Sequence, residues 1–446
     1  MSPASPPPAN EVSLTLPASD RPVKQTRNWF VGLISVRVYT IVRASEGTVE
    51  TLLLHVPKLE DYYPPFGRYM NVNYMPMGML ALSAHLARSG HPTEVVHAGI
   101  EKILDPGWRV ADLVSSRGFR AVGLSLHWHY QAYDVARAVE RIRSVRPDLF
   151  LFAGGITASY FGREMLETIP GLDAVVIGES FEPVRRMLDA LERGGTPAGV
   201  PNLAWRESGE GREGSIVVNP ETLLHPPEFF ENLPFADFSA FPRAGRYVAQ
   251  FGFPRAYSWE LTPEENRAMM TMGRTFFPLF TGSGCARSCT YCGGNARTQR
   301  RAFHHHRILW RSHRAVLDDI RRALDAGYRT MALCFDPMPE STAWYVELFS
   351  RMRRETPEAD LYFECWSLPD PEFVRAFADT FSPPHSYLAL SPDSGSEQVR
   401  RANKGYFYTN DQLFRTADLL KKHGVQMDVF FSIGFPGETV PLALET

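Results

Sequence analysis

Three of the five cysteines in the chain fall within one short segment of mixed small and polar residues. These are Cys285, Cys289 and Cys292, in the run Gly-Cys-Ala-Arg-Ser-Cys-Thr-Tyr-Cys-Gly-Gly. Three thiolates at this spacing on one loop can each hold one iron of a 4Fe-4S cluster. The fourth iron then has no protein ligand. The spacing therefore predicts a redox cluster with one iron open to a substrate or a cofactor.

Zinc and a buried redox-silent cluster are the alternatives for this segment, because cysteine-rich loops often bind zinc. A zinc site would need a second cysteine pair or a histidine pair at finger spacing, and the sequence has neither. The nearest imidazoles, His304, His305 and His306, are consecutive and cannot all complete one tetrahedron. We expect them in an exposed basic segment. Cys334 and Cys365 stand singly in apolar runs, where a free cysteine usually behaves as a small core residue.

An aromatic residue, Tyr291, stands immediately before the third cysteine, and with it the segment resembles the signature of the radical S-adenosylmethionine (SAM) enzymes. The resemblance implies that the amino and carboxylate groups of SAM chelate the open iron. It also implies that the reduced cluster passes one electron to SAM. SAM then splits into methionine and a 5'-deoxyadenosyl radical, which abstracts hydrogen from an unactivated carbon.

The bulk composition indicates a globular protein of two or three domains, because the chain has 446 residues of which 44% are hydrophobic. The formal net charge is -3, so the composition does not indicate the positively charged surface that nucleic-acid binding needs. The cysteines leave no disulfide framework, and no stretch approaches the roughly 18 apolar residues that a membrane span needs. We therefore expect a cytoplasmic protein without membrane or nucleic-acid partners, preceded by a disordered tail and lead-in at residues 1–45.

Residues 46–195 alternate short aliphatic runs with amphipathic stretches, which predicts a parallel sheet covered by helices. The predicted strands are 52–56, 93–97, 121–126, 149–153 and 174–177. Such units are typical of a flavodoxin-like, doubly wound α/β domain. Ligands of this architecture bind outside the carboxyl ends of the strands.

The predicted strand ends of this first domain carry glycines and small polar residues that let backbone approach a ligand. They resemble the cobalamin-binding domain that precedes the barrel in one large class of radical SAM enzymes. The resemblance implies that Ser125, Leu126, Gly154, Gly155 and Thr157 line a cobalamin pocket. The family's Ser-X-Leu segment is matched in part only, because Ser125 and Leu126 are adjacent here.

A second departure concerns the lower ligand of cobalt. The Asp-X-His-X-X-Gly signature that supplies an axial histidine in many cobalamin proteins is missing from residues 57–64. This favours cobalamin bound without that ligand. His127 and His129 could approach the cobalt, or they could be polar loop residues beside a packed Trp128. An inherited fold that has lost its ligand is the alternative for the whole domain.

Residues 196–274 are rich in proline and predict an irregular connector with some strand content. From residue 275 to 446 strands and helices resume, and the pattern resembles the radical SAM partial (β/α)6 barrel. The predicted strands are 276–281, 330–335, 361–366, 387–390 and 427–433. The resembled barrel has a sixth unit, so we expect a barrel truncated after the fifth strand.

Three segments of this barrel resemble the SAM contacts of the family. The implied SAM-binding residues are Tyr291, Gly293, Gly294, Asp393, Ser394, Ile433 and Gly434. Each could instead be a helix cap or a turn residue. Asp336 and Glu364 also end predicted strands, where they could touch substrate or SAM or could cap the next helix.

The resemblance implies a cobalamin-dependent radical SAM enzyme, and we expect a C-methyltransferase that acts on a small-molecule or peptide natural-product precursor. The implied cofactors are a 4Fe-4S cluster, SAM and cobalamin, with an electron donor such as flavodoxin or ferredoxin as partner. The alternatives are cobalamin-independent radical chemistry, such as rearrangement or sulfur insertion, and a non-catalytic protein that binds the cluster or a corrinoid. No catalytic side chain can be identified from the sequence.

Overall fold

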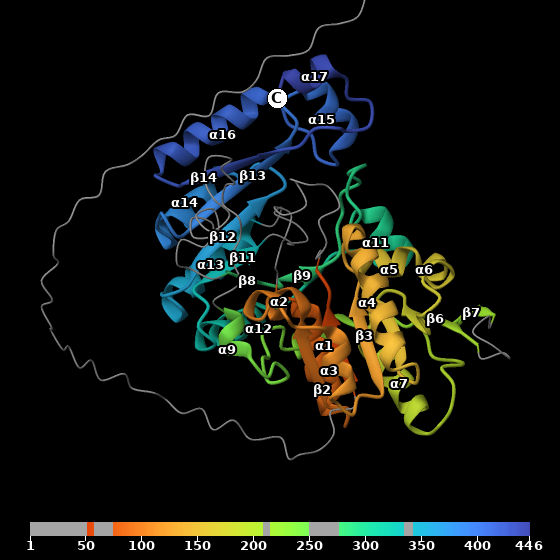
Figure 1. Cartoon of the computed structure of the whole chain (residues 1–446). Helices are drawn as coiled ribbons and strands as arrows, with labels where there is room; N and C mark the ends of the chain where they lie inside the picture. Colours follow the sequence, from red (N-terminus) through yellow and green to blue (C-terminus); the bar gives the residue numbers. More distant parts are fainter. Residues whose placement is uncertain (1–50, 58–74, 208–214, 249–275, 334–341) are drawn as a thin grey trace, which may run out of the picture. The chain divides into compact units, whose positions relative to one another are not determined.

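The computed structural model describes residues 51–57, 75–207, 215–248, 276–333 and 342–446, and these residues fall in one compact unit (Figure 1). The expected tail at residues 1–45, the segment 58–64, Cys334 and Asp336 lie outside the described residues. No helix among the described residues is long and apolar enough to cross a membrane.

The first part of the described chain builds a seven-stranded sheet with the order β2-β1-β3-β4-β5-β6-β7. Its strands are β1 Thr51–His55, β2 Thr93–His97, β3 Ala121–Ser125, β4 Phe150–Gly154, β5 Ala174–Val176, β6 Leu203–Arg206 and β7 Ile216–Val218. β1 to β5 pair in parallel, which confirms the predicted flavodoxin-like order. β6 and β7 lie in the predicted connector and add two antiparallel strands to the same sheet.

Helices cover both faces of this sheet, because its strands are apolar on both sides. On one face, Leu53 packs in a core with residues of α1 (Met77–Arg88) and α7 (Phe181–Glu192). On the other face, Leu52 and Leu54 pack in a second core with residues of three helices: α3 (Val110–Ser115), α4 (Ala132–Val145) and α6 (Gly162–Thr168). Three short helices complete this part: α2 Ala98–Leu104, the 3-10 helix η2 His129–Gln131, and α5 Ile156–Tyr160.

The second part forms a five-stranded parallel sheet with the order β14-β13-β12-β11-β8. Its strands are β8 Phe276–Pro278, β11 Thr330–Leu333, β12 Asp360–Cys365, β13 Tyr387–Asp393 and β14 Met427–Phe431. All five correspond to predicted strands. A two-stranded ladder of β9 (Gly282–Ser283) and β10 (Leu309–Trp310) flanks the segment that contains the three cysteines.

Several helices of the second part begin at a residue whose side-chain oxygen accepts a hydrogen bond from the first turn of the helix. Ser312 accepts a hydrogen bond from Ala315 N at the start of α12, and Asp370 accepts from Phe373 N at the start of α14. The helices are α11 Ala296–Ala302, α12 His313–Asp325, α13 Thr342–Glu355, α14 Pro371–Thr380, α15 Glu397–Asn403, α16 Asn410–Lys422 and α17 Val440–Leu444.

The described part of the connector carries α8 (Pro227–Glu231) and α9 (Ala244–Val248), and its backbone is hydrogen-bonded to a buried ion pair at the start and middle of the segment that contains α12. Arg311 Nη1 lies 2.8 Å from Asp319 Oδ2, and both side chains are almost wholly buried. Arg311 also donates to Leu233 O, and Asp319 Oδ1 accepts from Phe235 N. Both charges are therefore hydrogen-bonded by the connector backbone, which removes most of the cost of burying them.

Candidate cofactor sites

The segment with the three cysteines is a loop held between β9 and α11. Gly284 starts the loop with φ of +100°, a conformation that side chains disfavour. Asn295 ends it, because its side-chain oxygen accepts from Arg297 N and Thr298 N and caps α11. The amide of Asn295 also donates to Cys289 O at 2.9 Å, so the helix cap fixes the middle of the loop.

Backbone amides point at two of the three sulfur atoms. Arg287 N donates to Cys285 Sγ at 3.3 Å, and Gly405 N donates to Cys289 Sγ at 3.1 Å. Burial raises the pKa of the Cys285 and Cys292 thiols, and the neighbouring Cys289 raises both further. The three sulfurs are therefore close enough to repel one another when they are thiolates. The iron ions of a bound cluster would stabilise these thiolates.

A cluster suits these cysteines better than a single zinc ion does. Structural zinc sites take four protein ligands, whereas this loop offers three thiolates. A 4Fe-4S cluster can be held by three cysteines, each of which binds its own iron. A separate group of possible metal ligands among the described residues is His91, Asp189 and Glu192, whose ligand atoms lie within 4.8 Å of one another.

The cluster loop is tied to the segment that follows α15. Thr290 donates from its backbone to Asn403 O at 2.9 Å and from its hydroxyl to Asn403 Oδ1 at 2.6 Å. The amide of Asn403 in turn donates to Pro436 O at 3.0 Å. Gly405 lies so close that an added Cβ would sit 2.6 Å from Ser288 N. Sequence reasoning missed Asn403 and Gly405, because only the fold brings them to the cysteines.

A charged cluster lies where β13 ends, beside the same loop. Asp393 has φ of +65° and follows a register shift in the pairing of β13 with β14. Its carboxylate accepts from Tyr291 Oη at 2.7 Å and from Lys404 Nζ at 2.5 Å, and Lys404 also donates to Ser391 O. Two predicted SAM residues, Tyr291 and Asp393, are therefore in direct contact. Lys404 was missed, since it carries no local signal.

Glu364 lies on β12 next to this charged cluster. Its carboxyl accepts from Ser391 Oγ at 2.9 Å. Burial raises the pKa of Glu364 to about 7, and the Asp393 carboxylate adds to the rise while Ser391 and Lys404 oppose it. Glu364 caps no helix, because Asp370 caps the helix that follows.

The loop after β14 approaches Tyr291 from the other side. The rings of Tyr291 and Phe435 meet edge to face with centroids 4.9 Å apart. Glu438 Oε2 accepts from Gly434 N and Phe435 N, and Gly434 has φ of +92° with open space where a side chain would stand. Ile433 is 77% exposed. The loop therefore presents its backbone and an aromatic edge beside Tyr291.

Two of the remaining predicted SAM residues differ in their surroundings: Gly293 borders open space, whereas Ser394 is buried. No protein atom lies within 4 Å of a Cβ added at Gly293, so the space before this residue is open. Ser394 is buried, and its hydroxyl accepts from Ser396 N. Ser394 therefore shapes the turn between β13 and α15 and does not point into open space.

The predicted cobalamin residues meet at the carboxyl ends of β3 and β4. Ser125 Oγ lies 2.6 Å from His55 Nδ1 at the end of β1. The Leu126 side chain is fully buried in the core. Gly155 has φ of +117°, and a Cβ there would lie 2.7 Å from Leu126 O. The hydroxyl of Thr157 donates to a backbone oxygen of the neighbouring loop at 2.9 Å. Gly155 thus lets the loops after β3 and β4 pack backbone against backbone, and it adds no side chain of its own at the strand ends, which fits a large ligand.

Neutral imidazoles lie beneath these strand ends. Burial lowers the pKa of His55 to about 3, with His127 adding to the effect, and burial lowers the pKa of His127 to about 4. Gln131 holds the loop, since its oxygen accepts from Trp128 N at 2.7 Å and its amide donates to Val56 O at 2.7 Å. His129 is exposed at the start of η2.

The two predicted cofactor loops lie side by side. A Cβ added at Gly294 would lie 3.7 Å from Ile156 Cδ1 and 3.9 Å from Cys292 Sγ. Arg301 of α11 donates to Tyr160 Oη at 3.1 Å and lies over the tyrosine ring. The loop that follows the third cysteine is therefore packed on the start of α5, immediately after Gly154 and Gly155.

One prediction near this contact is wrong. His305 was expected in an exposed basic segment, yet it is buried and its Nε2 lies 2.6 Å from Glu179 Oε1. The local sequence is basic, but a carboxylate that follows β5 gives the buried imidazole a hydrogen-bond partner. Cys365 is buried, as expected of a core cysteine.

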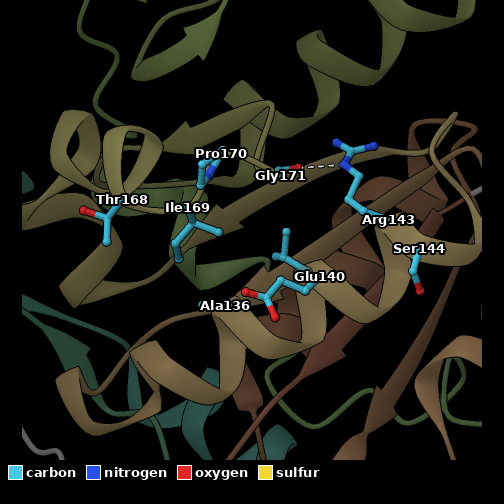
Figure 2. Close-up of a pocket in the computed structure, with 9 residues that line it drawn as sticks. Ala136, Glu140, Arg143, Ser144, Thr168, Ile169, Pro170 and Gly171 are labelled. Carbon is cyan, nitrogen blue, oxygen red and sulfur yellow. Dashed lines mark hydrogen bonds between the residues drawn. The ribbon is translucent and has the colours of Figure 1, made fainter. Parts of the chain in front are cut away.

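A shallow hollow on the first domain is unrelated to these sites (Figure 2). It lies between α4 and the segment from Thr168 to Gly171, where Arg143 Nε donates to Gly171 O at 2.8 Å. Arg143 also donates to Leu149 O and to Asp173, at the amino ends of β4 and β5. Parallel strands place this hollow at the edge opposite to the predicted cofactor loops.

Comparison with protein families decides what these two parts are. The model of the radical SAM superfamily matches residues 279–441, which include all three cysteines and the charged cluster. Residues 279–441 therefore form a radical SAM domain. The model of the B12 binding domain matches residues 69–188, so this radical SAM protein carries a B12-binding domain ahead of its radical SAM domain. Its cofactors are a 4Fe-4S cluster and SAM in the radical SAM domain and cobalamin in the B12-binding domain.

Two curated relatives of this radical SAM protein are methyltransferases by name. It is 22% identical over 267 residues to an uncharacterized methyltransferase of Pyrococcus horikoshii, covering 59% of this chain and 48% of the relative. It is 28% identical over 165 residues to the hopanoid C-3 methylase of Methylococcus capsulatus, covering 35% of this chain and 27% of that enzyme. The chain spans less than half the length of both curated relatives.

Solved structures of cobalamin-dependent radical SAM proteins share the fold. The methyltransferase TsrM from Kitasatospora setae, solved with cobalamin and a 4Fe-4S cluster, matches with a TM-score of 0.62 at 19% identity, covering 89% of this chain and 69% of TsrM. OxsB, solved with aqua-cobalamin and SAM, matches with a TM-score of 0.59 at 14% identity, covering 89% of this chain and 51% of OxsB. The likeness in fold confirms the predicted order of domains, with a B12-binding domain followed by a radical SAM domain.

Proposed function

We propose that this chain is a cobalamin-dependent radical SAM methyltransferase that methylates a carbon atom of a small-molecule or peptide natural-product precursor. The observation that carries the proposal is the packing of Gly294 between Ile156 and Cys292. It brings the cluster loop of one domain against the glycine loop of the other. An enzyme that used both cofactors on one substrate would need them to share one cavity.

The chain's own residues have separate roles in this proposal. Cys285, Cys289 and Cys292 hold the cluster. Gly293 and Gly294 leave room for the methionine part of SAM, and the carboxylate of Asp393, oriented by Tyr291 and Lys404, meets its ribose. The backbone at Ile433 and Gly434 and the edge of Phe435 flank the adenine beside Tyr291.

The first domain has its own binding residues in the proposal. Ser125, Gly154, Gly155 and Thr157 form the floor on which cobalamin lies, with the buried Leu126 packed beneath it and the neutral imidazole of His55 behind Ser125. When bound, the cluster with SAM supplies the hydrogen-abstracting radical and cobalamin supplies the methyl group. A cavity shared by the two cofactors would protect a reactive substrate from water.

The domain limits are part of the proposal: 46–195 for the B12-binding domain, 196–274 for the connector and 275–446 for the radical SAM domain. β6 and β7 of the connector extend the first sheet. We further propose that a flavodoxin or ferredoxin supplies the electron.

SAM labelled with deuterium in its methyl group tests the proposal. Under anaerobic reducing conditions the cluster-loaded and cobalamin-loaded protein should release 5'-deoxyadenosine and should transfer the label to its bound corrinoid. Release of 5'-deoxyadenosine with no labelled corrinoid would instead indicate cobalamin-independent radical chemistry. Neither product would indicate a protein that binds the cofactors without catalysis.

A further inference from the structure

Glu179 is a buried carboxylate that links three separate parts of the chain. It follows β5 and precedes α7, and its side chain is 5% exposed. Its Oε2 accepts from His225 N at 2.8 Å and lies 2.6 Å from His225 Nδ1. Its Oε1 lies 2.6 Å from His305 Nε2. One carboxylate thus joins the B12-binding domain to the connector and to the radical SAM domain.

Each partner of Glu179 is itself buried and fixed. The ring of His225 lies against Phe229 with centroids 4.0 Å apart and edge-on to Phe181 at 5.8 Å. His305 N donates to Gln299 O of α11, and its side chain is 6% exposed. Neither imidazole can follow the carboxylate elsewhere without leaving a buried polar group unpaired.

The bond to His305 lies a short way along the chain from the cluster. His305 follows α11, which begins soon after Cys292 and ends at Ala302. Gly178, next to Glu179, has φ of +80°, and an added Cβ would lie 2.8 Å from Ala302 O. The end of α11 is therefore held against the end of β5 by a close backbone contact and by a buried ionic hydrogen bond.

We propose that Glu179, His225 and His305 form a clamp that fixes the B12-binding domain against the cluster loop, so that Glu179 and His305 are positioning residues for the transfer between the two cofactor sites. The inference rests on the proposed function, because it assigns the clamp to the geometry between the two sites. The apolar core that contains Leu53 extends into the radical SAM domain through Phe277 and Leu361. Apolar packing tolerates small shifts, whereas two directional bonds to one carboxylate define the register.

The charge of Glu179 agrees with this role. Burial alone would raise the pKa of Glu179, but the hydrogen bonds from His225 and His305 outweigh it and lower the pKa to about 2. The carboxylate is therefore ionised at neutral pH and forms charge-assisted bonds, which are stronger than neutral ones.

His305→Asn is the variant that tests the clamp, because it breaks the bond between the domains and leaves the pair of Glu179 with His225 intact. The neighbouring His306→Asn is the matched control, since His306 is exposed. Glu179→Gln is the second variant and keeps the shape of the side chain without its charge. If Glu179→Gln fails to fold, His305→Asn still decides the question.

Amide hydrogen exchange gives the first readout and needs neither cofactor turnover nor substrate. We expect exchange in α11 and in the first turn of α7 to be about tenfold faster in His305→Asn than in the wild type, with His306→Asn unchanged. Equal exchange in all three proteins would overturn the clamp. Hydrogen exchange tests the clamp even if the wild type binds no corrinoid. Absence of corrinoid would contradict the proposed function but not the clamp.

The magnetic coupling between cob(II)alamin and the reduced cluster gives the second readout. We expect the wild type and His306→Asn to show one well-defined coupling in electron paramagnetic resonance spectra. His305→Asn, loaded with iron and corrinoid to the same extent, should show a weaker or broadly distributed coupling. A coupling identical to that of the wild type would show that His305 stabilises the fold without positioning the cofactor sites.

Discussion

The two sheets present different chemistry at their carboxyl ends. In the B12-binding domain the polar groups are backbone amides, small hydroxyls and imidazoles whose pKa burial lowers to about 3 at His55 and about 4 at His127. In the radical SAM domain they are charged or ionisable, with Lys404 and Asp393 in contact and Glu364 beside them. The ends of β1 and β3 therefore carry neutral imidazoles at neutral pH, whereas the end of β13 holds an ion pair.

The difference follows from what each edge would bind. SAM carries an ammonium, a carboxylate and a sulfonium, so its site needs charges that are compensated within the protein until SAM arrives. A corrin ring offers a broad surface with amide side chains, so its site needs open backbone and neutral hydrogen-bonding groups. The same rule of strand-end binding therefore yields two sites with different electrostatics, one lined by neutral groups at β1 and β3 and one by a compensated ion pair at β13.

Loss of a cluster ligand should give the largest effect and should leave the first domain untouched. Cys289→Ala removes the thiolate that Gly405 N contacts, so we expect no intact cluster and no 5'-deoxyadenosine from SAM. Corrinoid binding should persist. Cys365→Ala is the control, because this cysteine is buried in the apolar core and is not one of the three cluster ligands, so this variant should retain iron. Iron analysis and product chromatography measure both, and a cluster retained in Cys289→Ala would refute the ligand assignment.

The neutral character of the first edge is tested by the pH dependence of stability. The pKa of His55 is about 3 in the folded protein and near 6.5 when unfolded, so the unfolded state takes up the proton first. Stability should therefore fall as pH drops from about 6.5 to 4, by about 2–3 kcal/mol from this group.

His55→Gln should remove that part of the pH dependence, while His129→Gln, at an exposed position, should keep it. Urea unfolding at several pH values gives the measurement. An unchanged slope in His55→Gln would show that this edge holds charge and would break the contrast between the two sheets.

The opposite sign is expected at the second edge. The pKa of Glu364 is raised from 4.5 to about 7, so the folded protein keeps the proton while the unfolded chain loses it. Stability should fall as pH rises from about 4.5 to 7 and should stay lower above that range. Glu364→Gln removes the penalty, and we expect it to be more stable than the wild type at pH 8 by about 1–3 kcal/mol. The exposed Glu358→Gln should show no such gain in the same unfolding titrations.

The smallest predicted effect concerns Lys404, whose ammonium joins Asp393 and Ser391. Lys404→Met removes the charge and leaves Asp393 without a cationic partner in this contact, so the carboxylate is less well oriented toward SAM. We expect the dissociation constant of SAM to rise about tenfold, which is about 1.4 kcal/mol. Titration of cluster-loaded protein with SAM measures it, and Lys421→Met, on the exposed end of α16, should bind as the wild type does.

The sequence predicts the two sheets well, because buried β-branched and aliphatic runs are local signals that need no knowledge of the fold. The cysteine spacing and the glycines at strand ends are local signals too. Lys404, Asn403 and Glu179 were missed as functional neighbours because their partners lie far away in the chain. His305 was misplaced for the same reason, since a basic run alone does not reveal the buried Glu179 carboxylate that is hydrogen-bonded to it.

Metal and corrinoid content tests the central claim most directly, because the account requires both sites in one chain. The protein should be purified without oxygen from cells supplied with hydroxocobalamin. We predict about four irons and about one corrinoid per chain. Monodisperse protein with its iron in place and no corrinoid would contradict the account and would leave cobalamin-independent radical chemistry as the function.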